Sequence, residues 1–161
     1  MNVEIRILDQ RLHGWGFPKW GSQWAAGLDL YACIDEPLRV LPQAPPLFVS
    51  TGMAFRIGDP DWCGLIFPRS GLAHRHGLVL GNTIGVVDAD FDGPCMISVW
   101  NRNNPVNVDE PVRSTSIVTI NPGDRIAQLV FTRVVRPSLA IVEQFSRRSP
   151  RGSSCYGSTG F

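Results

Sequence analysis

The clearest candidate for chemistry is the segment Pro68-Arg69-Ser70-Gly71, which follows an apolar run. A strand that ends there and then turns would offer a guanidinium, a hydroxyl and open backbone N–H groups at one point. That combination suits an oxyanion. The alternative is an ordinary strand-to-helix cap with Ser70 as the N-cap, and taken alone the segment favours this structural role.

A second candidate is Asp88, which closes the apolar run 83–88. A carboxylate at the end of a buried strand can act as a general base, because partial desolvation raises its basicity. Asp90, Asp92 and Gly93 follow closely, and an aspartate in such surroundings more often starts a turn. Both interpretations of Asp88 stay open.

Three further features are weaker when each is taken alone. Asn82 follows Gly81 and is typical of a hairpin turn, although its amide could equally meet the edge of a base. Gln128 ends a segment that leads from a tight turn into a strand, where most such side chains are solvated. The tail 151–160 combines arginine, an aromatic ring, hydroxyls and glycines. It could close over a phosphate chain and stack on a base, but a featureless terminus is the better interpretation without other support.

Metal-ligand and disulfide patterns are missing from the sequence. His74 and His76 are two residues apart and His13 is distant, without acidic or cysteine partners at ligand spacing. The four cysteines never form a Cys-x-x-Cys pair, which favours buried free thiols in a reducing cytosol. They are Cys33, Cys63, Cys95 and Cys155.

The elements that must position these residues are short strands between dense turn signals. This spacing predicts an all-β, jelly-roll-like domain. Only Ser70 to His76 has the pattern of a helical turn, and Gly77 would end it. The start, residues 1–7, alternates as a strand does and is no signal peptide. The other predicted strands lie at 47–49, 65–67, 84–87, 96–100, 117–120 and 129–135.

The 161 residues suit one domain that buries roughly 70% of its unfolded surface. We expect a β domain over 1–145 and, from its composition, a mobile tail over 146–161, with a long surface loop from Asn101 to Ser116. A formal net charge of +1 argues against a general nucleic-acid or membrane-surface binder. No apolar stretch is long enough to span a membrane. The cysteine pattern described above leads us to expect a cytoplasmic protein. Trp15, Trp20 and Trp24 would pack at a subunit surface or cover a sheet.

Five segments, in this order, resemble the motifs of the trimeric dUTPase family, and together they span nearly the whole chain. They are Ala26-Gly27-Leu28-Asp29-Leu30-Tyr31-Ala32, Pro68-Arg69-Ser70-Gly71-Leu72-Ala73, residues 85–93, Gly123-Asp124-Arg125-Ile126-Ala127-Gln128 and residues 151–160. The resemblance implies a homotrimer of jelly-roll (β-clip) subunits that hydrolyses dUTP to dUMP and pyrophosphate. Such an enzyme keeps uracil out of DNA and supplies dUMP for thymidylate synthesis. Each active site would combine motifs from different subunits.

The resemblance also implies residue roles. Asp88 matches the carboxylate that activates the attacking water. Asp29 matches a residue that contacts Mg²⁺ through water, while the triphosphate itself holds the ion. Four residues match phosphate contacts: Arg69, Ser70, Gly71 and Gln128. Five match the uracil and sugar pocket: Asn82, Val86, Val87, Phe91 and Met96. In the tail, Arg151 matches a contact to the terminal phosphate, Tyr156 the ring that stacks on uracil, and Gly157 and Ser158 belong to the same motif.

Some positions depart from the family pattern. Phe91 stands where tyrosine is usual, Asp92 replaces a residue that is often basic or an amide, and Ser153-Ser154-Cys155 replaces a glycine-richer stretch. Two rival functions remain. One is a dCTP deaminase of the same fold, whose glutamate has no match in this sequence. The other is a jelly-roll protein that binds nucleotide without turnover, which the intact Asp88 and tail disfavour.

Overall fold

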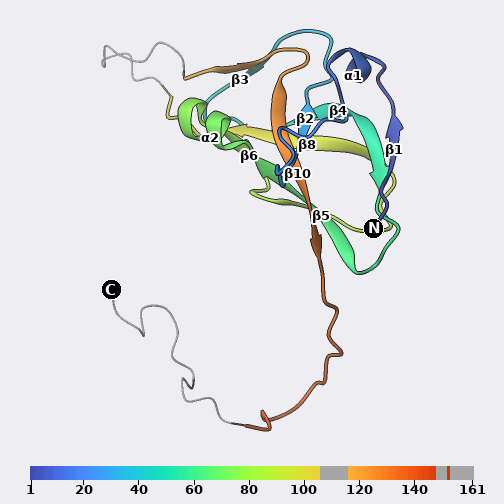
Figure 1. Ribbon diagram of the computed structural model, residues 1–161. Coiled ribbons are helices and arrows are strands. Elements are labelled where there is room, and N and C mark those ends of the chain that lie inside the picture. The colour runs from blue at the N-terminus through green and yellow to red at the C-terminus, as the bar shows by residue number, and fades with distance from the viewer. Residues whose placement is uncertain (106–115, 148–151, 153–161) are drawn as a thin grey trace.

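The strands pack into two facing antiparallel sheets (Figure 1), and in some of them buried and exposed side chains alternate. In β8, Cys95, Ile97 and Val99 are buried while Met96 points outward. The computed structural model describes residues 1–105, 116–147 and 152. Within these residues, neither helix has the length and apolar character needed to cross a bilayer. The all-β prediction is confirmed.

The first sheet has the strand order β1-β4-β8-β6, and the second has the order β2-β10-β5-β7. The strands of the first are β1 (Glu4–Ile7), β4 (Leu47–Arg56), β8 (Pro94–Asn101) and β6 (Leu78–Leu80). The strands of the second are β2 (Leu28–Tyr31), β10 (Arg125–Arg133), β5 (Trp62–Pro68) and β7 (Gly85–Val87). A two-stranded sheet pairs β3 (Leu38–Val40) with β9 (Val118–Ile120).

The predicted helix is confirmed as α2 (Ser70–His76), and Gly77 ends it in the left-handed conformation with φ 73°. The predicted N-cap was one residue late: Arg69 is the cap, with extended backbone, and Ser70 is the first helical residue. A second short helix, α1 (Arg11–Gly14), was not predicted. It buries Leu12 in the core, so a single apolar anchor in a polar run gave too little periodicity to reveal it.

The turn at Asn82 does not close a hairpin, which corrects the sequence interpretation. It joins β6 in the first sheet to β7 in the second, so the strands on its two sides are not paired with each other. Thr83 in this turn adopts a positive φ of 63°. The chain therefore crosses between the sheets at the place where candidate site residues lie.

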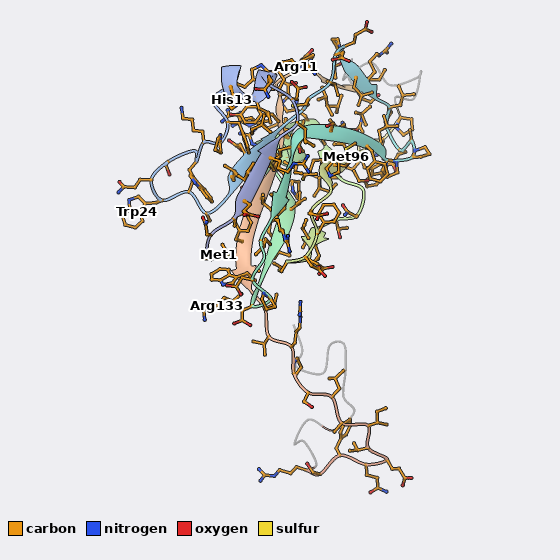
Figure 2. All side chains as sticks on the ribbon, turned by 90° about the vertical axis from the view of Figure 1, so that its right-hand side faces the viewer. Met1, Arg11, His13, Trp24, Met96 and Arg133 are labelled. Atoms are coloured by element: carbon orange, nitrogen blue, oxygen red, sulfur yellow. The ribbon has the colours of Figure 1, made fainter. Side chains whose placement is uncertain are left out.

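Three thiols are buried as expected, and one of the three tryptophans, Trp15, is partly buried against the core. Cys33, Cys63 and Cys95 are free and buried, which confirms that prediction, whereas Cys155 lies outside the described residues. Burial raises the pKa of the Cys33 thiol to about 11. Trp15 stacks on Tyr31 with ring centroids 6.1 Å apart. Trp24, in contrast, is 90% exposed and projects away from the body in Figure 2.

Asn101 belongs to the core and not to the surface loop that was expected to begin there. It is the last residue of β8 and is fully buried. Its Nδ2 donates to the carbonyl oxygens of Val40, at 2.9 Å, and Ser116, at 2.5 Å. Its Oδ1 accepts from the backbone N–H of Asn103 at 3.0 Å. The amide thus links the end of β8 to β3 and to Ser116. Residues 106–115, between Asn101 and Ser116, lie outside the described residues.

Replacing Asn101 with alanine should lower the free energy of unfolding by about 1–3 kcal/mol, because the carbonyls of Val40 and Ser116 lose their donor. Asn104→Ala is the matched control, since Asn104 is exposed and such a change usually costs within about 0.5 kcal/mol. Urea unfolding of both variants measures the difference. Equal stability of the two variants would show that the Asn101 amide does not anchor the sheets.

Candidate active site

Pairing of β10 with two neighbours brings the first group of candidate residues together. Gln128 pairs with Asp29 of β2 on one side and with Phe67 of β5 on the other. Arg69 and Ser70 follow the end of β5 directly. Segments that are far apart in sequence are therefore adjacent here, and Asp29, Gln128 and Arg69 meet at the end of β5.

Asp29 holds two arginines in this group. Its Oδ1 lies 2.9 Å from Nε of Arg69, and its Oδ2 lies 3.0 Å from Nη1 of Arg125. Nη1 of Arg69 also donates to the backbone carbonyl of Arg125 at 3.0 Å. The Asp29 side chain is only 16% exposed, so these pairs are partly shielded from water. The carboxylate therefore orients the Arg69 guanidinium before any ligand arrives.

Gln128 is fixed by close contacts on two sides. Its Nε2 donates to the carbonyl oxygen of Pro68 at 3.0 Å. Gly27 lies against it so closely that an added Cβ would meet Oε1 at 2.6 Å. Only a residue without a side chain leaves room for this amide, which explains why a glycine stands two residues before Asp29.

These side chains surround a pocket of about 530 Å³, which we call the α2 pocket. Asp29, Arg69, Ser70, Gly71 and Gln128 all line it, so the residues expected to hold phosphates converge. Sequence reasoning missed three nearby residues: Arg75 and His76, which line the pocket from α2, and Arg125, which pairs with Asp29. Helical spacing from Gly71 to Arg75 is the signal that could have identified Arg75.

Magnesium fits this pocket only as an ion held mainly by a ligand. Within the described residues, nowhere do three His, Cys, Asp or Glu side chains group as metal ligands. Both oxygens of Asp29 already face arginines, so the carboxylate has little capacity left for direct coordination. Mg²⁺ commonly keeps several waters and binds through substrate phosphates with one or two carboxylates. Asp29 could then contribute through water.

A second hollow, of about 320 Å³, lies between β7, β8 and the turn at Asn82; we call it the β7–β8 pocket. All five residues expected around a base and sugar line it: Asn82, Val86, Val87, Phe91 and Met96. Figure 2 labels Met96 on its strand. The pocket also includes Cys95, whose pKa is raised by burial, so this wall carries a neutral thiol.

The ring of Phe91 lies over Gly93. A Cβ added at Gly93 would meet the tip of the Phe91 ring at 2.9 Å. The absence of a side chain at Gly93 therefore lets the ring lie at the rim of the β7–β8 pocket, where Phe91 is 43% exposed.

Asp88 follows β7 and lines neither of the two pockets. It is exposed, and Val86 beside it on β7 is 65% exposed. The expected partial desolvation at the end of a buried strand is therefore wrong for the single chain, because β7 is an edge strand. The expected tail residues Arg151, Tyr156, Gly157 and Ser158 lie outside the described residues.

Antiparallel pairing also keeps Asp88 away from the α2 pocket within one chain. Val87 pairs with Gly64, which is four steps along β5 from Pro68. At about 3.3 Å per residue these steps span roughly 13 Å. Asp88 lies beyond Val87 and Ser70 lies beyond Pro68, so the two side chains occupy opposite ends of β5.

Solved structures share this fold. The dUTPase of Staphylococcus bacteriophage 80alpha, in a variant solved with dUpNHpp, matches with a TM-score of 0.81 over 99% of both chains at 24% identity. A variant dUTPase from phage phi11 of S. aureus, described with a structural Mg(II) ion, matches with a TM-score of 0.72 at 25% identity, over 91% of this chain and 100% of that one.

Sequence comparison extends the similarity over the whole chain. The deoxyuridine 5'-triphosphate nucleotidohydrolase of Idiomarina loihiensis is 44% identical over 98% of this chain and 97% of that protein. The enzyme of the same name from Ralstonia pickettii is 44% identical over 99% of both chains. The family model described as dUTPase matches residues 14–160. The chain therefore belongs to the dUTPase family.

Proposed function

We propose that this protein hydrolyses dUTP to dUMP and pyrophosphate, with a water molecule activated by Asp88 attacking the α-phosphorus. The observation that carries the proposal is the α2 pocket, where a carboxylate-held Arg69 lies beside Ser70 and Gln128. The relatives named above act, by their names, on deoxyuridine triphosphate. Their identity over nearly the full chain supports the same substrate here.

The α2 pocket would hold the triphosphate. Phosphoryl transfer depends mainly on positioning and on stabilising charge at the phosphate oxygens. Donors for those oxygens would come from Arg69, Ser70, the backbone at Gly71, and Gln128. The ion pair with Asp29 restricts the Arg69 side chain to one orientation. Bound Mg²⁺ would neutralise part of the phosphate charge, with Asp29 its water-mediated contact. Preorganised donors of this kind lose little energy to rearrangement when the transition state forms.

The β7–β8 pocket would hold uracil and deoxyribose. Asn82 and the backbone of β7 offer polar groups at one wall, while Val87 and Met96 supply apolar surface. A thymine methyl would overfill the pocket at a cost of about 1–3 kcal/mol. Phe91, which lines this pocket, would exclude a ribose 2′-hydroxyl, whose unpaired burial costs about 1–3 kcal/mol. That cost corresponds to roughly 10- to 100-fold discrimination against UTP.

The complete site requires more than one chain, and we infer a homotrimer. Asp88 and Ser70 occupy opposite ends of β5, so a single copy cannot bring both to one phosphorus atom. The segment 134–147 supports assembly as well, because it leaves the body after β10 (Figure 1) and exposes a set of large apolar side chains. Such exposed apolar surface is typical of interaction sites. The set is Val135, Leu139, Ile141, Val142 and Phe145, all at least 55% exposed.

We further propose that residues 1–145 form the catalytic β domain and that 146–161 act as a lid over the bound nucleotide. In this lid Arg151 would meet the terminal phosphate and Tyr156 would stack on uracil, with Gly157 and Ser158 along the phosphates. Buried free thiols at Cys33, Cys63 and Cys95 favour a reducing compartment, which supports a cytoplasmic location. The protein would need no direct contact with nucleic acid.

Pyrophosphate release in the presence of Mg²⁺ tests the proposed reaction. The protein should cleave dUTP and should cleave UTP at least 10- to 100-fold less efficiently, as estimated above from the unpaired hydroxyl. Cleavage of dTTP and dCTP should also be far slower. Ammonia release from dCTP would instead indicate a deaminase. Absence of cleavage of all four nucleotides would indicate a protein that binds without turnover.

Asp88→Asn should nearly abolish turnover, because the amide cannot accept a proton from water at this position. Affinity for dUpNHpp and the mass of the assembly in solution should stay close to wild type. Asp90→Asn is the matched control, since Asp90 is exposed in the same turn and has no proposed role. Turnover retained in Asp88→Asn, or lost equally in Asp90→Asn, would show that the base is misassigned.

A further inference from the structure

The side of α2 that faces the α2 pocket carries a cation with no assigned role. Gly71, Leu72, Arg75 and His76 line the pocket, and their spacing of four residues places them on one helix face. Arg75 is exposed, so its side chain is open to a ligand in the pocket.

The backbone under Arg75 is held from outside the helix. Nη2 of Arg102 donates to the carbonyl oxygen of Ala73 at 3.0 Å, and Nδ2 of Asn103 donates to that of His76 at 2.8 Å. Gly77 then ends the helix. Arg75 therefore projects from a fixed turn and not from a loose loop, so little backbone entropy is lost when it meets a ligand.

Charge balance separates Arg75 from the other arginines nearby. Arg69 and Arg125 share the carboxylate of Asp29. Arg75 forms neither an ion pair nor a hydrogen bond through its side chain with any other residue in 1–105 or 116–147. It is thus a guanidinium at the pocket whose charge no protein carboxylate offsets, and an anionic ligand can meet it without breaking an existing pair.

We propose that Arg75 is a substrate-binding residue that contacts the phosphates which leave as pyrophosphate. Arg75 lies five positions after Ser70 on the helix, about 7.5 Å along the axis at 1.5 Å per residue. It therefore meets a more distant part of a phosphate chain than Arg69 and Ser70 do. This inference rests on the proposed function, since it names a further contact for the same triphosphate.

The test compares ligands with and without the outer phosphates. Arg75→Gln should weaken binding of dUpNHpp about five- to tenfold, the range expected for one charge-assisted hydrogen bond at an exposed site. Inhibition by inorganic pyrophosphate should weaken similarly, whereas affinity for dUMP should change less than about twofold. KM for dUTP should rise more than kcat falls, and 0.5 M NaCl should shrink the difference from wild type.

Two further variants keep the result interpretable. Arg75→Lys, which retains the charge, should recover most of the affinity for pyrophosphate. Arg39→Gln makes the same charge change at an exposed residue of β3 that lies outside both pockets, and it should leave all affinities at wild-type values.

Unchanged dUpNHpp binding in Arg75→Gln, an equal loss for dUMP, or an equal effect of Arg39→Gln would overturn the role of Arg75. In each case wild-type turnover of dUTP would leave the proposed function standing. A wild-type protein that neither cleaves dUTP nor binds dUpNHpp would overturn both proposals.

Discussion

The site depends on the antiparallel pairing of β5 with a different partner on each edge. On one edge β10 carries Gln128 alongside Phe67 and, through β2, brings Asp29 to the end of β5 where Arg69 and Ser70 follow. On the other edge β7 runs in the opposite direction, so Val87 pairs with Gly64, far from that end. This one strand therefore helps to form the α2 pocket and at the same time holds Asp88 away from it. Under the proposed function, copies of the chain would have to combine to complete a catalytic site.

Electrostatics within the α2 pocket divide the work among the arginines. Asp29 fixes Arg69 in orientation at the cost of neutralising part of its charge. This arrangement suits a residue that must point a donor at one place, since orientation matters most near the reacting phosphorus. Arg75 lacks such a partner in the described part of the chain and keeps its full charge, which suits attraction of a polyphosphate. Asp29 thus acts first on the protein's own arginines, and its contact with magnesium would be secondary to that.

Sequence alone predicted the elements whose signals are local. Gly77 marked the end of α2, and β-branched runs between turns marked β4, β5, β8 and β10. Features that depend on tertiary contacts escaped prediction. The sequence around Asn101 predicts the start of a polar loop, but the residue is buried and its amide forms three hydrogen bonds within the fold. The exposure of Asp88 likewise follows from the edge position of β7, which no local pattern specifies.

Sequence predicted several residues that line the α2 pocket, but not the contacts among them. The motifs pointed to Arg69, Ser70 and Gln128. They did not indicate that Asp29 would form ion pairs with two arginines, or that Arg75 would line the same pocket. The division into two separate pockets on one chain also lies beyond sequence, because it follows from which strands pair. The proposed function therefore requires that Ser70 and Asp88 of one active site come from different copies of the chain.

Mixing two inactive variants tests that consequence most directly. Asp88→Asn and Ser70→Ala protomers, each inactive alone, would be unfolded, combined in equal amounts and refolded together. Sites built from two copies should regain activity at about one quarter of the wild-type level, because random assembly places an intact Ser70 opposite an intact Asp88 in that fraction of sites. A mixture as inactive as its components would contradict the account, since it would mean that both residues must come from the same chain.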